Sequence, residues 1–430
     1  MSRRKILIVS HNPISKVDNM GKTIGNIFSN FPKEELCQLY LHNQTPNFDI
    51  CDQYYAFNEV SIVKSIFKNI ETGEVVINKP NVDHVDKDQK PATSKSKIKS
   101  FLYQYGRSRN DFIYCVRNLI WNCGKWNTNA LKEWIKEQNP TCIFFFVGDY
   151  FFLFNIVLEI AHSLNIPVYS YYVDDFYFSK KIKQKLGMDA RLYRKAFKKL
   201  YSESKMNFCI SEKMANDYEN QFHTPTHVLM NTSNKVLSKK MNQSNKIIMS
   251  YFGNISYNRW ENLSLLSDAI STLNKMYDKK IEFNIYSGEK NKETLEKLTS
   301  NPNVNFKGQI STDEVLNKMI ESDILVHVES FNEMTKASVK YSVSTKIPDL
   351  LASNRIIIAF GPEDVASIEY LSKYNTALVL KDNDVQQIME QLKPIYLGDD
   401  FQTYKDNAIY LYNKNHTSES IKEILYDTLK

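Results

Sequence analysis

Cysteine is scarce in this sequence and shows none of the spacings that usually give it a function. Six cysteines occur in 430 residues, at positions 37, 51, 115, 123, 142 and 209. No two of them form a Cys-x-x-Cys pair, so neither a zinc site nor a disulfide framework is indicated. We therefore expect reduced thiols and a cytoplasmic protein.

Long apolar runs are also missing. The most apolar stretch, 143–160, carries Gly148, Asp149 and Glu159. Charged groups near the centre of a bilayer are costly, so this stretch predicts a strand, a turn and a helix rather than a membrane span. The first residues, 1–5, lead directly into an apolar strand without the apolar core of a secretory signal.

The charge balance has little excess of either sign. Lys and Arg total 55 against 49 Asp and Glu, a formal net charge of +6. A charge this small for the length does not argue for a nucleic-acid partner, and we expect none. Tyr and Phe are frequent, with 26 and 24 residues. This suits strand-rich cores or sugar-binding surfaces, although a biased genome composition gives the same excess.

Short apolar runs rich in β-branched and aromatic residues predict buried parallel strands. In the first half we expect strands at 5–10, 141–147, 167–173 and 207–210, the last closing that half. In the second half we expect strands at 246–252, 281–286, 304–306, 324–328, 356–359 and 377–380. Helical segments separate these strands, including one that begins near 21–23 and one over 151–164. This alternation predicts βαβ units and an α/β fold.

The rhythm breaks near 223–227 and restarts at 246, which predicts two domains. We expect an N-terminal Rossmann-like domain over 1–228 and a C-terminal one over 229–413. Residues 70–100 are polar and contain Pro80 and Pro91, and they predict a flexible insertion. The closing helix, 414–430, either completes the second domain or crosses back to the first.

Polar residues follow the first strand of the second half, where open α/β sheets bind ligands. Gly253 and Asn254 come directly after that strand, and Arg259 follows six positions after the glycine. A glycine lets backbone approach a ligand, and an arginine can pair bidentately with a phosphate. An ordinary turn with a solvated arginine is the alternative.

A denser group of polar residues follows in 323–354. His327 and Glu329 alternate with apolar residues at the end of a predicted buried strand, which predicts that they face a polar site. Ser344, Thr345 and Lys346 precede Pro348, a first-turn helix residue. Their donors would lie at a helix N-terminus, which suits a diphosphate.

One turn into this helix, Asp349 is placed to accept hydrogen bonds from ribose hydroxyls, and Asn354 predicts the helix end. The alternative is a structural His–Glu pair beside an ordinary capped helix.

The first half offers fewer candidates. Gly21-Lys22-Thr23 suggests a P-loop, but position 16, where a Walker A motif needs glycine, is Lys16, so a nucleoside triphosphatase is excluded. Three carboxylates follow apolar strands, and one of them could orient or deprotonate an acceptor hydroxyl: Asp149, Asp174 and Asp175. Helix capping is the equal alternative for each.

Taken with these motifs, the chain resembles the GT-B glycosyltransferases, especially the family 4-like enzymes of bacterial capsule and surface-polysaccharide clusters. The resemblance spans most of the chain and is strongest over 246–370. The run from Gly253 to Arg259 resembles that family's donor-phosphate loop, 304–308 its loop near the nucleotide base, and 349–358 its ribose-binding segment. The family's two acids stand eight residues apart, whereas Glu329 and Asp349 are separated by twenty.

The resemblance implies a GT-B fold, with two Rossmann-like parallel-sheet domains facing a central cleft. It implies transfer of a sugar from a nucleotide-sugar to a hydroxyl of a lipid-linked glycan, with retention and without a metal or other cofactor. Gly308 would approach the base, and Gly21 and Lys22 the donor from the first domain. The arginine that the family has after the loop glycine is Asn254 here, and we infer that Lys346 supplies the missing charge. Arg259 and Lys346 would then stabilise the leaving diphosphate, Glu329 and His327 would contact the sugar or diphosphate, and Asp349 the ribose.

Two further possibilities remain from the sequence. A nucleotide-sugar epimerase or a phosphorylase would share the fold, and a non-catalytic sugar- or nucleotide-binding protein would share the site. Residues 95–117 interleave basic and aromatic side chains, which predicts peripheral contact with an anionic membrane on its cytoplasmic face or, alternatively, a solvated helix packed on the first domain.

Overall fold

The computed structural model describes residues 4–16, 19–42, 44–78, 111–178, 187–233 and 246–429. The expected insertion from 79 onward and the basic–aromatic stretch up to 110 lie outside these residues. The chain divides into two units. The first contains Met1–Cys209, Asp217–His227 and Leu425–Lys430, and the second contains Ile210–Asn216 and Val228–Ile424.

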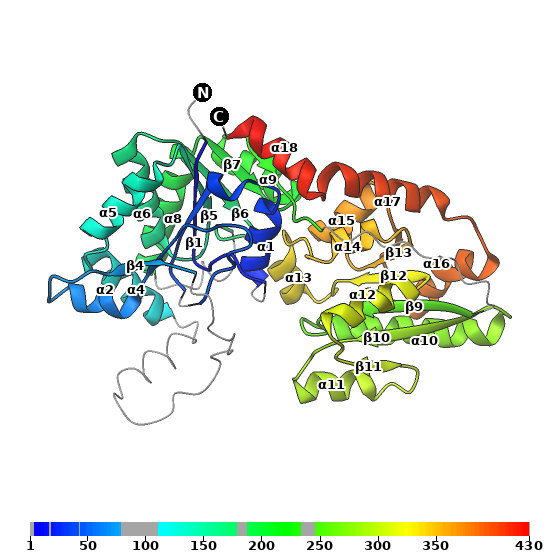
Figure 1. Cartoon of the computed structure of the whole chain (residues 1–430). Helices are drawn as coiled ribbons and strands as arrows, with labels where there is room; N and C mark the ends of the chain where they lie inside the picture. Colours follow the sequence, from blue (N-terminus) through cyan, green and yellow to red (C-terminus); the bar gives the residue numbers. More distant parts are fainter. Residues whose placement is uncertain are drawn as a thin grey trace. The chain divides into compact units, whose positions relative to one another are not determined.

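The described part of the first unit is built on an eight-stranded sheet with the order β4-β3-β2-β1-β5-β6-β7-β8 (Figure 1). Its strands are β1 (Ile6–Ser10), β2 (Leu36–Tyr40), β3 (Tyr54–Phe57), β4 (Gly73–Val76), β5 (Cys142–Phe146), β6 (Val168–Tyr172), β7 (Met206–Cys209) and β8 (Thr226–Val228). β1 pairs in parallel with both β2 and β5, so the strand order reverses between β1 and β5.

Helices separate most of these strands, as βαβ crossovers require, although β3 follows β2 without one. They are α1 (Asn19–Phe28), α2 (Glu59–Ser65), α4 (Asp111–Cys123), α5 (Asn129–Gln138), α6 (Phe151–Leu164), α8 (Gly187–Glu203) and α9 (Glu212–Phe222), with a short 3₁₀ helix, η1, at Lys33–Glu35. Local signals set their ends: the Thr128 side chain caps α5, and Asn139 and Asn165 end α5 and α6 in the left-handed conformation.

The described part of the second unit has a six-stranded parallel sheet with the order β11-β10-β9-β12-β13-β14. Its strands are β9 (Lys246–Phe252), β10 (Lys280–Tyr286), β11 (Phe306–Gly308), β12 (Ile324–Val328), β13 (Ile356–Phe360) and β14 (Leu378–Leu380). Its helices are α10 (Arg259–Met276), α11 (Lys292–Thr299), α12 (Thr312–Glu321), α13 (Glu333–Val339), α14 (Ile347–Ala352), α15 (Ala366–Lys373), α16 (Val385–Leu397), α17 (Gln402–Asn415) and most of α18 (Ser418–Thr428).

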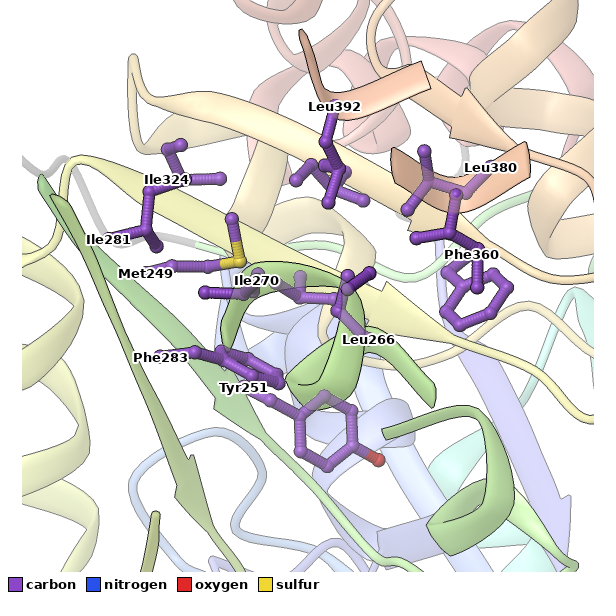
Figure 2. Close-up of a cluster of buried hydrophobic side chains, with 14 of the residues drawn as sticks. Met249, Tyr251, Leu266, Ile270, Ile281, Phe283, Ile324, Phe360, Leu380 and Leu392 are labelled. Carbon is purple, nitrogen blue, oxygen red and sulfur yellow. The ribbon is translucent and has the colours of Figure 1, made fainter. Parts of the chain in front are cut away.

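Apolar side chains on one face of this second sheet form a continuous core (Figure 2). Met249 and Tyr251 project from the same face of β9, because side chains two residues apart share a face of a strand. They pack with Phe283 of β10 against Leu266 and Ile270 of α10. A second apolar cluster, which includes Leu325, Ile357 and Leu351, belongs to the same unit.

The predicted α/β class and the two parallel-sheet domains are confirmed, and most predicted strands lie within two residues of their observed positions. The apolar stretch 143–160 is a strand, a turn and a helix, as expected. None of the described helices has the length and apolar character needed to cross a bilayer.

Several local predictions were wrong. The strand 207–210 does not close the first sheet, because β8 follows it in the sheet order. Residues 73–76 are not a loop but the antiparallel edge strand β4. β2 and β3 were not predicted, because buried Gln38 interrupts one apolar run and the other has only four residues. The closing helix begins at Ser418, since α17 ends at Asn415 and buried His416 occupies the break.

The abundant aromatic residues of the first unit pack its interior. Phe197 of α8 is fully buried, and its ring lies within 5.2 to 6.3 Å of several others, measured between ring centroids. The neighbouring rings are those of Phe154, Tyr172, Tyr177, Tyr193, Tyr201, Tyr218 and Phe222. Rings at these separations add favourable edge and offset contacts to their burial.

Truncating this ring is expected to destabilise the first unit strongly. The change Phe197→Ala removes a fully buried ring and leaves a cavity, which typically lowers the free energy of unfolding by about 3–5 kcal/mol. Phe67→Ala is the matched control, because Phe67 is 85% exposed and its loss should change stability by less than about 0.5 kcal/mol. Urea unfolding followed by tyrosine fluorescence measures both; equal losses would contradict this assignment of the core.

In the second unit, a fully buried histidine that follows α17 bonds to Asn231, near the start of the segment Val228–Ile424. His416 Nδ1 donates to the carbonyl oxygen of Asn231 at 2.8 Å, so Nε2 is left to accept from the Tyr370 hydroxyl, also at 2.8 Å. Burial lowers the pKa of His416 from 6.5 to about 4, with the bond to Asn231 opposing the shift. The folded protein therefore holds this imidazole neutral.

Stability of the second unit should consequently fall with acidification. The unfolded chain takes up a proton on this histidine below about pH 6.5, whereas the folded chain does not until about pH 4. The stabilisation is fully present above pH 6.5 and is lost as the pH falls through this window, by about 1 kcal/mol between about pH 7.5 and 5.5. Chemical denaturation at both pH values should show that His416→Gln loses less stability on acidification than the wild type. A variant of exposed His162 serves as the control.

Candidate functional site

The carboxyl ends of β9 and β12 define the main candidate site. β9 has β12 on one side and β10 on the other, so the strand order reverses between β9 and β12. Open α/β sheets bind ligands at such switch points, beyond the carboxyl ends of the strands. β9 ends at Phe252 and β12 at Val328, so Gly253 and Glu329 come directly after the two strands.

An ion pair between Arg259 and Glu329 connects the two strand ends. Arg259 is the first residue of α10, and its guanidinium donates from Nη2 to both carboxylate oxygens, at 3.0 and 2.8 Å. Its Nε donates to Glu329 Oε2 and to the Val328 carbonyl oxygen, both at 3.1 Å. The side chains are only 16% and 4% exposed. The pair is therefore bidentate and largely removed from water, a geometry that fixes the guanidinium plane.

Two residues that were not predicted from the sequence contact the backbone carbonyl of Glu329 and fix its position. The buried Asn262 side chain of α10 donates to the Glu329 carbonyl oxygen at 2.7 Å. Gly361 packs against the same residue so closely that a Cβ there would lie 2.8 Å from that oxygen. A signal was available for Gly361, because it directly follows an apolar strand, as Gly253 does.

The structure gives a reason for glycine at position 253 other than close approach of the backbone to a ligand. A Cβ at this position would lie 2.5 Å from the phenol oxygen of Tyr251, which itself donates to the Asn254 carbonyl oxygen at 2.8 Å. The glycine thus makes room for a tyrosine. Tyr257 and Asn258, just before Arg259, both adopt the left-handed conformation with φ near +58° and +57°. Non-glycine residues in that region store strain, which is common in loops that position functional groups.

His327 and Glu329 are both too buried to form an open surface. His327 Nε2 lies 3.0 Å from the Ser367 hydroxyl of α15 and 3.6 Å from Glu329 Oε1. Burial, together with the positive charges of Arg259 and Lys346, lowers the pKa of His327 to about 3, so the imidazole is neutral near pH 7. Burial raises the pKa of Glu329, and Arg259 opposes the rise. Glu329 is therefore placed to orient Arg259, and His327 lies buried behind Glu329.

Lys346 differs from these buried groups, because its side chain is exposed to solvent. Within the described residues its ammonium has no hydrogen-bond or ion-pair partner. Surrounding protein and the charge of Arg259 lower the pKa of Lys346, while Asp349 and Glu329 oppose the shift. The same charges therefore act on Lys346, Arg259, Glu329 and Asp349, so these four residues belong to one electrostatic cluster.

The helix start beside Lys346 offers fewer donors than the sequence predicted. Pro348 does stand in the first turn of α14, but the helix is only six residues long. The backbone N–H of Lys346 donates to the Ser344 hydroxyl at 3.4 Å, that of Ile347 donates to the Ser344 carbonyl at 3.0 Å, and Pro348 has none. Amide dipoles of α14 are therefore a weak anion site, and neighbouring Thr345 is solvent-exposed. The cationic side chain of Lys346 is the stronger feature.

The other predicted donor residues lie at varying distances along the same edge. Asp349 accepts a short hydrogen bond from the Ser233 hydroxyl. Asn254 is exposed, and its side-chain oxygen accepts from the Ser256 N–H at 2.6 Å. Gly308 ends the edge strand β11, separated from β9 by β10, and has φ of +77°. Asn354 is left-handed, with φ of +53°, and ends α14 as predicted.

The first-unit candidates are distributed along the carboxyl edge of the other sheet. Gly21 lies in α1, where a Cβ would meet the Pro13 carbonyl oxygen at 2.6 Å, so packing requires it; Lys22 beside it is exposed. Asp175 Oδ1 accepts from the Tyr177 and Phe178 N–H groups and from the Tyr218 hydroxyl, at 2.9 to 3.0 Å. These bonds give Asp175 the alternative, structural role. Asp149 and Asp174 remain as candidate bases.

Removing one partner of the buried ion pair is expected to destabilise the second unit. The change Glu329→Gln leaves the Arg259 charge without its carboxylate, which should lower the free energy of unfolding by about 3 kcal/mol, the low end for a buried pair because Arg259 keeps some contact with water. Glu333→Gln is the control, since Glu333 is 81% exposed and pairs with Lys336 only at the surface. Urea denaturation compares them; a similar small effect from both changes would argue that the pair is open in solution.

Comparison with known proteins addresses the fold. No protein-family model matches the chain, and no curated protein matches it in sequence. Solved structures do match over the whole chain. A sucrose-phosphate synthase from Thermosynechococcus elongatus is 12% identical with a TM-score of 0.58, covering 99% of both chains. A glycosyltransferase from Rickettsia africae is 11% identical with a TM-score of 0.57, covering 100% of this chain and 98% of that one.

A third match is the HepE protein of Anabaena, solved in complex with UDP and glucose. It is 11% identical, with a TM-score of 0.58 and 99% coverage of both chains. Identities this low establish architecture, and the two parallel-sheet domains of this chain are those of the GT-B fold.

Proposed function

We propose that this protein is a glycosyltransferase whose second unit binds a nucleotide-sugar donor. The observation that carries the proposal is the pairing of two cationic groups at the switch point of the second sheet. Arg259 Nη1 and Lys346 Nζ have no acceptor among the described residues, although their charges act on each other. Two donors without acceptors at a strand-end site suit the oxygens of a diphosphate.

The charge arrangement suits the chemistry of sugar transfer. When the sugar–oxygen bond breaks, negative charge accumulates on the departing nucleoside diphosphate, and preorganised cations lower the barrier most at that point. Glu329 holds the Arg259 guanidinium in one plane, so little reorganisation is needed when the charge develops. His327 is neutral, because burial and the charges of Arg259 and Lys346 disfavour its protonation, so it does not repel these two cations.

The remaining parts of the donor site follow the family resemblance. Asp349 would accept a ribose hydroxyl through the carboxylate that Ser233 orients. Gly253, Asn254 and Gly308 would line the phosphate and base ends of the donor. HepE, which shares the fold, was solved with UDP and glucose, and that ligand pair supports a nucleotide-sugar as the class of donor.

The acceptor side is proposed on the same resemblance. We propose transfer to a hydroxyl of a lipid-linked glycan in surface-polysaccharide synthesis, with retention at the anomeric carbon and without a metal. Asp149 or Asp174 of the first unit would orient or deprotonate that hydroxyl. Peripheral contact with an anionic membrane through 95–117 would bring the enzyme to such an acceptor.

Removing the Lys346 charge should weaken donor binding and slow transfer. A thermal-shift screen of nucleotide-sugars in EDTA identifies the donor, after which turnover of that donor is measured in the same buffer. Lys346→Ala is expected to lower kcat roughly 100-fold, the typical cost of losing one group that stabilises transition-state charge. Turnover in EDTA is expected to persist, because side chains supply the positive charge.

The matched control is Lys381→Ala, which removes an exposed lysine that follows β14 in the same unit. It should leave donor binding and turnover unchanged. The proposal fails if no nucleotide-sugar stabilises the wild type, or if Lys346→Ala and Lys381→Ala behave alike. Binding without any turnover of the donor would instead indicate a non-catalytic binding protein.

A further inference from the structure

The switch point of the first sheet carries a cluster of residues that the sequence analysis did not select. β1 lies between β2 and β5, and the chain leaves these three strands at Ser10, Tyr40 and Phe146. His11 follows β1 directly, His42 comes shortly after β2, and Tyr150 comes shortly after β5. Three loops at one sheet edge thus bring two imidazoles and a phenol together, at the place where such sheets bind ligands.

The three rings lie against one another, and an arginine guanidinium lies over one of them. The His11 ring stacks on the Tyr150 ring with centroids 5.5 Å apart, and the His42 ring meets His11 edge-on at 5.9 Å. The guanidinium carbon of Arg117, from α4, lies 4.1 Å from the Tyr150 ring centroid. Arg117 Nε donates to Glu59 Oε1 at 2.7 Å, which holds the guanidinium in place. We call His11, His42, Arg117 and Tyr150 the β1-edge cluster.

A buried amide fixes the loop that presents His11. Gln38 is fully buried in β2, and its Nε2 donates to the Ser10 hydroxyl at 2.8 Å and to the Asn12 carbonyl oxygen at 3.2 Å. Its Oε1 accepts from the Ile14 N–H at 2.9 Å. The His11 carbonyl oxygen in turn accepts from the N–H groups of residues 41 and 42. The position of His11 is therefore preorganised, which lowers the entropy cost of binding a ligand there.

His11 has an unmet hydrogen-bonding capacity. The residue as a whole is half-buried, but its Nδ1 is buried and has no partner within the described part of the chain. Buried polar atoms without partners are rare in folded proteins, and each asks for an explanation. Burial and the positive charges of Arg117 and His42 lower the pKa of His11 to about 3. Arg117 and His42 thus disfavour a positive charge on this imidazole; the Glu59 carboxylate pairs with Arg117, and Asp149 precedes Tyr150 in the chain.

We propose that the β1-edge cluster is a subsite for an anionic group, a phosphate or a carboxylate, of the glycosyl acceptor. An anion would supply the acceptor that the imidazole lacks, and its charge would be stabilised by Arg117 and by proton uptake on His11. Sugar phosphates and uronic acids both present such a group beside their hydroxyls. The assignment to the acceptor rests on the proposed glycosyltransferase function, but anion binding itself does not depend on transfer.

The test measures anion binding directly on full-length protein labelled with ¹⁵N-histidine. Inorganic phosphate, glucuronate and neutral glucose are added separately, and the imidazole resonances are followed by NMR; His11→Gln assigns the His11 signals. We expect phosphate, glucuronate or both to shift the His11 resonances and to raise the pKa of His11, with glucose doing neither. A response to phosphate alone assigns a phosphate group, and a response to glucuronate alone assigns a carboxylate.

Two further variants separate anion recognition from general effects. Arg117→Gln should weaken the anion response at least 10-fold, whereas His162→Gln, which alters an imidazole paired with Glu203 elsewhere in the first unit, should leave it intact. The unchanged His416 resonances of the second unit report that each variant is folded, and near-native far-UV circular dichroism reports the same for the first. The proposal is overturned if neither anion perturbs His11, if glucose acts as strongly as glucuronate, or if the response survives Arg117→Gln. Nucleotide-sugar binding is measured separately, so its absence would sink the proposed function without deciding this one.

Discussion

The bidentate pair between Arg259 and Glu329 is the interaction on which the second unit's site depends. It joins the first residue of α10 to the residue that follows β12, so two neighbouring strand ends and one helix share a single charge-assisted contact. A buried carboxylate is costly unless it is paired, and here the Arg259 guanidinium provides that pairing. Asn262 and Gly361 then fix the backbone of Glu329, which leaves Arg259 with little freedom to turn away.

This pair also explains how the polar residues His327 and Glu329 can be buried at the end of β12. β12 is buried throughout, and its alternation places His327 and Glu329 on one face. His327 remains neutral and bonds to Ser367, so it adds no charge beside the ion pair. Lys346 is exposed, whereas the ion pair is largely buried. The two cations thus differ in their access to solvent, and the buried one is held in a fixed orientation by Glu329.

The two sheets repeat one arrangement with different chemistry. In each, the first strand of the unit lies at the point where strand order reverses, and the candidate residues follow this strand and its neighbours. In the second unit these residues form an ion pair beside Lys346, whose ammonium has no partner among the described residues. In the first unit they form stacked rings under a guanidinium, positioned by the buried amide of Gln38. An aromatic layer suits a sugar ring and its substituents, whereas paired cations suit a diphosphate.

The sequence by itself determined the α/β class, the two domains and most strands, because continuous apolar runs of four to seven residues, separated by helical segments, are typical of parallel sheets covered on both faces. It also singled out His327 and Glu329, since ionisable groups are seldom buried without partners. Arg259 was selected for its spacing from Gly253, and Lys346 for its place before the helix that Pro348 begins. Which residues contact these side chains was decided only by the tertiary structure. That Glu329 neutralises Arg259, that Asp175 holds a turn, and that Gly253 makes room for Tyr251 follow from contacts between residues distant in the chain or folded back on it. The same holds for His11, His42, Arg117 and Tyr150, whose separation in sequence hides a proximity that only the strand order of the sheet creates.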